Sequence, residues 1–123
     1  MLEGFKKFEM AVGTSTISIT EHGVAFSKAC IVRLGKPRYV ELLIDYENKQ
    51  VAIKAATENT EGTFSFYNPQ KKVISVRWNN KDLLNEIENL MGWDLHKNGY
   101  KANGDYIPDE KATVFDLKSA SCI

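Results

Sequence analysis

The chain has 123 residues, which is the size of one ordinary domain. Hydrophobic residues make up 43% of it and charged residues 26%, so it can bury a core, and global disorder is excluded. Lys and Arg together number 16, as do Asp and Glu, which also excludes a uniformly basic nucleic-acid binder.

The N-terminal stretch and the cysteines indicate where the protein works. Glu9 interrupts the apolar core that an export signal needs, and no apolar run approaches the roughly 20 residues that span a bilayer. The two cysteines cannot build a disulfide scaffold, and we expect Cys30 to be a small buried hydrophobe. We therefore expect a cytoplasmic protein that makes no membrane contact.

The first half of the chain predicts four strands and a helix. Alternating apolar residues predict a strand over 16–20, and after a turn a short strand covers 24–26. Ser27 can cap a helix over 28–34, because its side-chain oxygen accepts a bond from a free backbone N–H. Gly35 and Pro37 end this helix. Strands over 39–45 and 51–55 follow.

The second half repeats this order of elements. Strands are predicted over 63–67 and 73–76, and Asn80 can cap a helix that ends at Gly92. Two more strands complete this half of the chain. One is predicted over 100–107 with a bend at Gly104, and the other over 112–117.

The predicted fold class is therefore α+β, with two tandem β-β-α-β-β units packed around one core. The single domain 1–123 contains the sub-repeats 15–56 and 63–118, and residues 119–123 form a flexible tail. The predicted core is Ile17, Ile19, Phe26, Ile31, Leu34, Leu42, Ile44, Ile53, Phe64, Phe66, Ile74, Leu83, Ile87, Leu90, Val114 and Phe115.

Residues 15–55 resemble the swapped-hairpin DNA-binding unit of AbrB-type transition-state regulators. The resemblance is carried by Ile17-Ser18-Ile19, Val24-Ala25-Phe26, Leu34-Gly35, Val40-Glu41-Leu42 and Val51-Ala52-Ile53. It implies two interlocked hairpin units, with basic residues around the helix that contact DNA. The family usually places Arg or Pro-Arg at the helix start, whereas this chain has Phe26-Ser27-Lys28.

The whole chain is similar in style to small early proteins of phages and prophages of Gram-positive bacteria, because it is rich in Asn and Lys and has only Arg33, Arg38 and Arg77. Some proteins of this kind are sensed by abortive-infection systems of the host.

Charge is segregated along the chain although its total is zero. Residues 24–40 and 68–81 each carry +4 without an acid, and a pseudo-twofold could merge them into one face of up to +8. Such a face attracts phosphate, and aromatic side chains nearby can stack on bases. The candidate nucleic-acid-binding residues are Lys28, Arg33, Lys36, Arg38, Lys71, Lys72, Arg77, Lys81, Tyr39 and Tyr67.

Signatures of catalysis are weak. His22 and His96 are the only histidines, and neither has a nucleophile or a metal partner at a suitable spacing. We predict no enzyme, no catalytic residue, no cofactor and no metal site.

Two hypotheses remain open. The first is a nucleic-acid-binding protein with weak sequence preference, and the second is a module that modulates, or is recognised by, a host protein. The run Leu42-Leu43-Ile44 predicts a strand covered on both faces, which favours a homodimer or larger assembly.

Overall fold

The computed structural model describes residues 3–4 and 13–123. Glu9, on which the argument about an export signal rests, lies outside the described residues. Within the described ranges no helix is long and apolar enough to cross a membrane.

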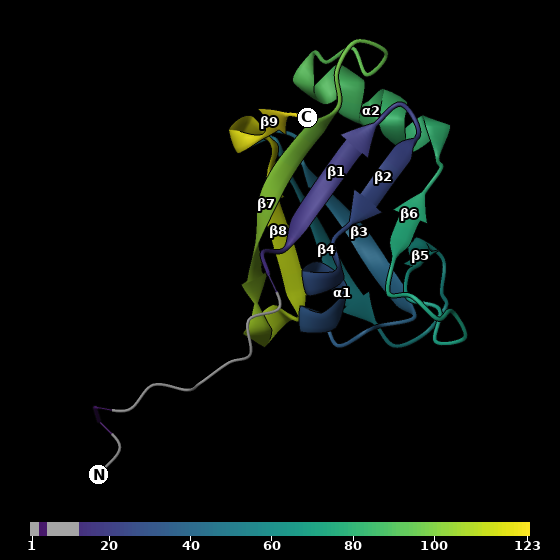
Figure 1. Ribbon diagram of the computed structural model, residues 1–123, viewed down its shortest axis with the longest axis vertical. Coiled ribbons are helices and arrows are strands. Elements are labelled where there is room, and N and C mark those ends of the chain that lie inside the picture. Colours follow the sequence, from purple (N-terminus) through teal and green to yellow (C-terminus); the bar gives the residue numbers. More distant parts are fainter. Residues whose placement is uncertain (1–2, 5–12) are drawn as a thin grey trace.

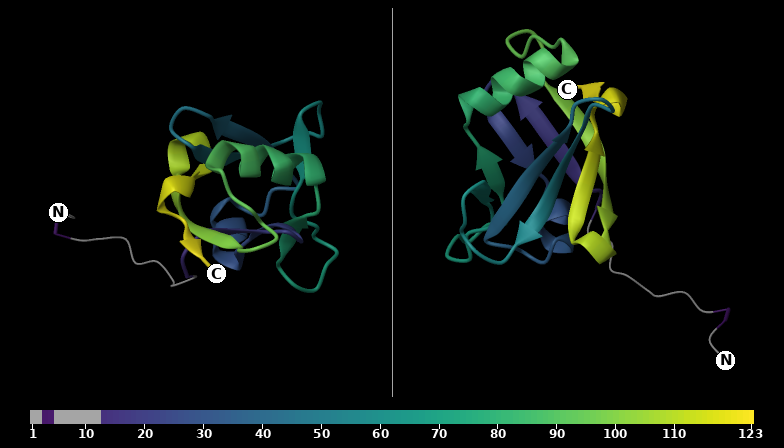
Figure 2. Two further views of the ribbon diagram at one scale, coloured as in Figure 1. Left: turned by 90° about the horizontal axis from the view of Figure 1, so that it is seen from above. Right: turned by 180° about the vertical axis from the view of Figure 1, so that it is seen from behind.

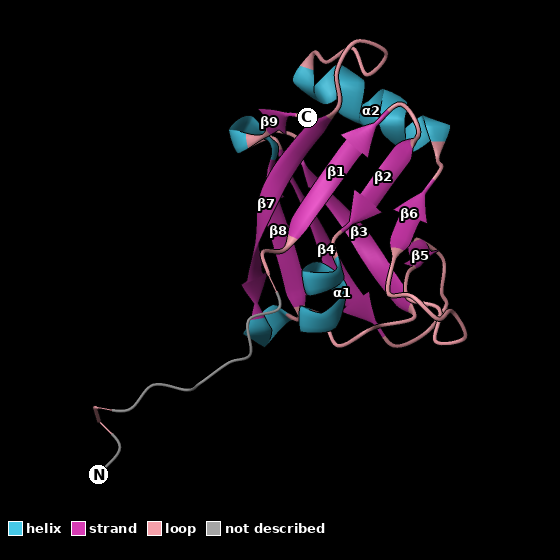
Figure 3. Ribbon diagram, viewed as in Figure 1, coloured by secondary structure: helices cyan, strands magenta, loops and turns pink. Residues whose placement is uncertain are grey.

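Strands dominate the fold and form one antiparallel sheet that curls into a half-barrel (Figures 1 and 3). Its strand order is β5-β3-β4-β8-β7-β1-β2-β6, and β9 pairs with β7. The strands are β1 (Thr16–Thr20), β2 (Gly23–Phe26), β3 (Tyr39–Asp45), β4 (Gln50–Ala56), β5 (Thr63–Ser65), β6 (Val76–Trp78), β7 (Tyr100–Ile107), β8 (Ala112–Asp116) and β9 (Ser121–Cys122).

The predicted fold class, α+β with two tandem β-β-α-β-β units, is wrong. Strands β7 and β8 of the second half lie between the hairpins β1–β2 and β3–β4 of the first half. Strand β3 also pairs with β5, and β1 with β7, so strands of both halves interleave in one sheet. Apolar alternation determines which side chains face the core, but it does not determine which strands become neighbours.

Two helices lie at opposite ends of the curled sheet (Figures 1 and 2). They are α1 (Lys28–Arg33) and α2 (Lys81–Met91). The predicted caps are confirmed: Ser27 Oγ accepts from the Cys30 N–H at 3.3 Å, and Asn80 Oδ1 accepts from the Leu83 N–H at 3.0 Å. Gly92 ends α2 in the left-handed conformation, with φ of 70°.

The core fills the space between the sheet and the two helices, and most of the predicted core is confirmed. Ten predicted residues are buried: Ile17, Ile19, Phe26, Ile31, Leu34, Ile53, Phe66, Leu83, Ile87 and Phe115. Five more are half-buried and pack against this core: Leu42, Ile44, Phe64, Ile74 and Leu90. Val114 is half-buried and pairs with Ala52 and Asp105. The prediction omitted Val24, Val40, Val51, Val76, Leu84, Leu95 and Leu117, which are also buried.

Three segments differ from the predicted elements, the first being the strand predicted over 63–67, which ends at Ser65. The strand predicted over 73–76 lies at Val76–Trp78 instead, because β2 offers backbone partners there: Val24 pairs with Trp78 and Phe26 with Val76. The last residues, predicted as a flexible tail, include β9, in which Cys122 pairs with Tyr100 of β7.

Strands β5 and β6 are the two edges of the sheet, and the side chain of Trp78 joins them. Its indole Nε1–H, from β6, donates to the backbone oxygen of Ser65 in β5 at 2.8 Å. The indole also stacks on Phe64 of β5, with ring centroids 4.8 Å apart. The Trp78 side chain therefore connects β5 and β6, the two strands at which the backbone hydrogen-bond pairing of the sheet ends.

Candidate nucleic-acid interface

Two segments that are distant in sequence meet at the end of the sheet that carries α1. The pairing of β3 with β5 continues past the strands, because the Phe66 N–H donates to the Arg38 oxygen at 2.7 Å. The Tyr67 N–H donates to the Pro37 oxygen at 2.9 Å. These two bonds place the predicted basic segment 36–38 directly beside the predicted aromatic residue Tyr67.

A surface hollow of about 330 Å³ lies at this junction. Among the residues that the structure describes, Arg38 is the one charged residue that lines it, and none of the lining residues is acidic. The hollow is lined by Arg38, Tyr39, Ser65, Phe66, Tyr67, Asn68, Pro69 and Gln70. We call this feature the Arg38–Tyr67 hollow. It combines a cation, two tyrosine rings and side-chain amides, which are groups that recognise phosphates and bases.

The local sequence explains how Lys36 comes to stand beside this hollow. Gly35 and Lys36 both have positive φ after α1, and the Lys36 N–H donates back to the Ile31 oxygen at 3.0 Å. This left-handed turn ends the helix and leads the chain into Pro37. The Lys36 ammonium lies 6.0 Å from the centroid of the Tyr67 ring, at the outer limit of a cation–π contact.

Lys71 and Lys72 lie on the loop between β5 and β6, which contributes the rim of the hollow. Asn68 Oδ1 accepts from the Gln70 N–H at 3.0 Å, and the Lys71 N–H donates to the Asn68 oxygen at 3.1 Å. This turn fixes the start of the loop, and the side chains of both lysines are exposed. Six of the ten candidates therefore belong to this part of the molecule: Lys36, Arg38, Tyr39, Tyr67, Lys71 and Lys72.

The other four candidates lie elsewhere. Lys28 is exposed on α1, whereas Arg33 is half-buried and donates from Nη1 to Ser15 Oγ at 3.3 Å. Arg77 and Lys81 line a different hollow of about 480 Å³, which Glu21 also lines. Since Lys81 begins α2, at the opposite end of the sheet from α1, the basic stretches 24–40 and 68–81 meet only in part and do not form one face with all eight cations (Figure 1).

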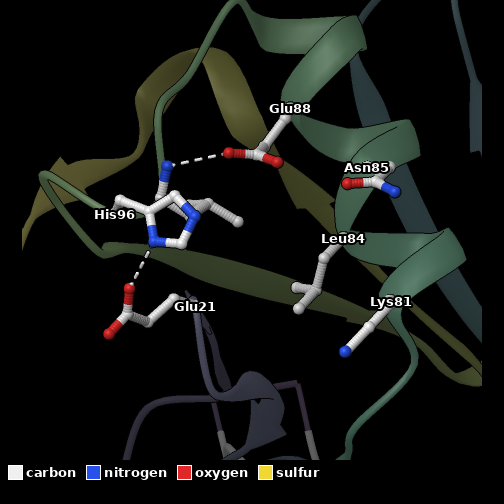
Figure 4. A pocket seen from close by; sticks show the side chains of 7 residues that line it. Glu21, Lys81, Leu84, Asn85, Glu88 and His96 are labelled. Atoms are coloured by element: carbon white, nitrogen blue, oxygen red, sulfur yellow. Dashed lines mark hydrogen bonds and ion pairs between the residues drawn. The ribbon is translucent and has the colours of Figure 1, made fainter.

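A further hollow of about 290 Å³ lies between α2 and the loop before β7 (Figure 4). Here His96 Nδ1 lies 2.9 Å from Glu21 Oε2, and His22 Nε2 lies 3.5 Å from Glu21 Oε1. Glu88 on α2 accepts from the Leu95 N–H at 2.9 Å and so holds the loop to the helix. Both histidines thus share one carboxylate, and the contact between Glu21 and His96 had no signal in the sequence.

We assign no reaction to this second hollow. A histidine beside a carboxylate can act as a general base only when a nucleophile or substrate proton is within reach. The residues that line the hollow are Glu21, Lys81, Leu84, Asn85, Glu88, Leu95 and His96, and none has a hydroxyl or thiol. In the part of the chain that the structure describes, no group of three or more His, Cys, Asp or Glu residues is arranged to hold a metal ion.

The Cys30 thiol is expected to resist modification while the protein is folded. Cys30 is fully buried, as predicted from the sequence, and burial raises the pKa of its thiol to about 12. The reactive thiolate is therefore scarce near pH 8, and reagent cannot reach the sulfur. Ellman's reagent at pH 8 should titrate only the exposed Cys122 in the native protein and both cysteines in denaturant. A Cys122→Ser variant should not react until it unfolds, and rapid native reaction of this variant would contradict the buried position.

Sequence reasoning found Arg38, Tyr39 and Tyr67 of the Arg38–Tyr67 hollow but missed its other members, and it placed Phe66 in the core only. Ser65, Asn68 and Gln70 enter the lining only because β5 pairs with β3 and the chain then turns at Asn68. The available signal was Asn68-Pro69, a dipeptide that favours a turn.

Comparisons of the chain with protein-family models, curated proteins and solved structures find no match.

Proposed function

We propose that the protein is a non-enzymatic nucleic-acid-binding protein that acts in the cytoplasm and reads sequence only weakly. In this proposal the cytoplasm is that of a bacterial host, and the protein is a phage or prophage early protein. The Arg38–Tyr67 hollow is the binding site, and Lys36, Lys71 and Lys72 contact the phosphates around it.

The observation that supports the proposal is the composition of one continuous surface. The segments 36–39 and 65–72 together carry four cations and two tyrosines without an acidic residue. Contacts from Lys and Arg to phosphates provide affinity but little sequence information, and the guanidinium of Arg38 can bind phosphate oxygens in a bidentate manner. The rest of the chain carries 12 Lys and Arg against 16 Asp and Glu, and this acidic excess would disfavour binding of nucleic acid elsewhere.

Reversing the charges of Lys36 and Arg38 is expected to weaken binding and to flatten its salt dependence. Each lost phosphate contact reduces the slope of log K against log salt by about 0.7–0.9, so Lys36→Glu with Arg38→Glu should reduce it by about 1.4–1.8. Both side chains are exposed, so the fold should be retained. Fluorescence polarisation with a labelled oligonucleotide at several salt concentrations measures this slope.

Lys49→Glu with Lys97→Glu is the matched control. Both residues are exposed, and Lys49 has the same φ of 55° as Lys36. The control changes the net charge by the same amount but lies away from the hollow, so it should lower affinity much less. Equal losses in the two double variants would show that net charge alone matters, and wild-type binding by Lys36→Glu/Arg38→Glu would remove this site.

A second candidate function is a protein-interaction module, including association with another copy of the chain. The outer face of the sheet supports it: Leu43 of β3 is 48% exposed, and it pairs with Ala52 of β4, which pairs in turn with Val114 of β8. This row is apolar and faces outward. If the wild type binds neither DNA nor RNA at low salt, this second function takes precedence.

A further inference from the structure

We infer that the Arg38–Tyr67 hollow accommodates one unpaired nucleobase, so that the protein prefers single-stranded nucleic acid to duplex. This inference rests on the proposed function and specifies its ligand. It comes from the shape and chemistry of the hollow rather than from the charge around it.

The lining of the hollow is mostly polar, but it includes the side chains of Tyr39 and Tyr67. Both tyrosines are half-buried, so part of each residue remains accessible, while Phe66, which follows β5, is only 7% exposed. Bases of any sequence have flat faces that stack on such rings. The backbone bonds from Phe66 to Arg38 and from Tyr67 to Pro37 hold the two segments together.

The rim of the hollow can meet the polar edge of a base without selecting one base. Asn68 Oδ1 is occupied by the Gln70 N–H, which leaves the Asn68 amide nitrogen as a donor. The Gln70 amide can both donate and accept. This pair can adapt to different base edges, which is consistent with weak sequence preference.

The cations lie beside the hollow in the position where flanking phosphates would pass. Arg38 belongs to the lining, whereas Lys36 contacts Tyr67 at 6.0 Å without lining the hollow. Glu41, two residues beyond Tyr39 on β3, lines a separate hollow together with Glu58. These two acids would repel a phosphate chain, so the strand should leave toward the loop that carries Lys71 and Lys72.

A base can enter the hollow only if it is not stacked inside a duplex. Extracting a paired base costs several kcal/mol, but an unpaired base requires no such extraction. The hollow therefore discriminates between single strands and duplexes, whereas the lysines, which contact only phosphates, would bind both.

The experiment compares labelled 12-nucleotide single strands of oligothymidylate and oligouridylate with a blunt duplex of the same length, by polarisation at low salt. The wild type should bind a single strand at least tenfold more tightly than the duplex. Tyr67→Leu should weaken single-strand binding by about 5- to 150-fold, which corresponds to the loss of one stacked base. Its effect on the weak duplex binding, which the lysines provide, should be much smaller.

Tyr67→Phe is the matched control, since it keeps the ring and should retain single-strand binding. Tyr39→Leu is a second test of stacking, and thermal melts show whether each variant is folded. Equal affinity for duplex and single strand, or wild-type single-strand binding by folded Tyr67→Leu and Tyr39→Leu, would overturn the inference. Failure of the proposed function looks different: it is the absence of binding to either form, or wild-type binding by Lys36→Glu/Arg38→Glu.

Discussion

Replacing Trp78 with alanine is expected to lower the free energy of unfolding by about 3–5 kcal/mol, the usual cost of removing a large buried ring. Trp78 of β6 is 9% exposed, and its side chain connects β6 to β5, the strand at the opposite edge of the sheet. Its ring centroid lies 4.9 Å from that of Phe26, 4.8 Å from Phe64 and 6.2 Å from Phe66. Urea unfolding followed by circular dichroism measures the change.

Trp78→Phe separates packing from hydrogen bonding. It keeps an aromatic ring in the core but removes the donor to the Ser65 oxygen, so it should cost less than the alanine variant. If Trp78→Ala loses less than about 1 kcal/mol, well below the cost expected for such a truncation, the link between β5 and β6 is not a stabilising part of the fold.

Ile87→Ala is expected to cost about 2–5 kcal/mol, because truncation of a buried aliphatic side chain loses contacts and leaves a cavity. Ile87 is 1% exposed and lies on the face of α2 that also carries Leu83 and Leu84. Through these three residues α2 covers one end of the half-barrel (Figure 2). Chemical denaturation of the variant gives the loss directly.

Asn89→Ala is the matched control on the same helix. Asn89 is exposed, so its replacement should change stability by no more than about 0.5 kcal/mol. Similar values for Ile87→Ala and Asn89→Ala would mean that α2 does not bury this face against the sheet.

The sequence was sufficient for most elements because their signals are local. Alternation in Thr16–Thr20 and the caps at Ser27 and Asn80 depend on nearby residues alone, and the structure has these elements where they were predicted. The arrangement was mispredicted because it depends on contacts between distant segments. The pairing of Ile17 with Ala102, for example, spans most of the chain and has no local signature.

The same distinction applies to the candidate site. Charge segregation and the tyrosines pointed to Arg38 and Tyr67 before any neighbour was known, and β3–β5 pairing brings them to one hollow. Arg77 and Lys81 carried an equal signal in the sequence, but β6 leads them away toward α2 and Glu21. Arg77 and Lys81 belong to the same basic stretch as Lys71 and Lys72, so the charge pattern alone could not separate them and only the path of the sheet does.

The link at Trp78 also bears on how the protein avoids aggregation. Edge strands expose rows of N–H and C=O groups that can recruit a strand from another chain. Here the two edges, β5 and β6, are only three residues long and are held close to each other by the indole of Trp78. A foreign strand that pairs at the Ser65 oxygen would compete with the indole for that acceptor, so one buried side chain both stabilises the fold and occupies an acceptor that intermolecular β-pairing could otherwise use.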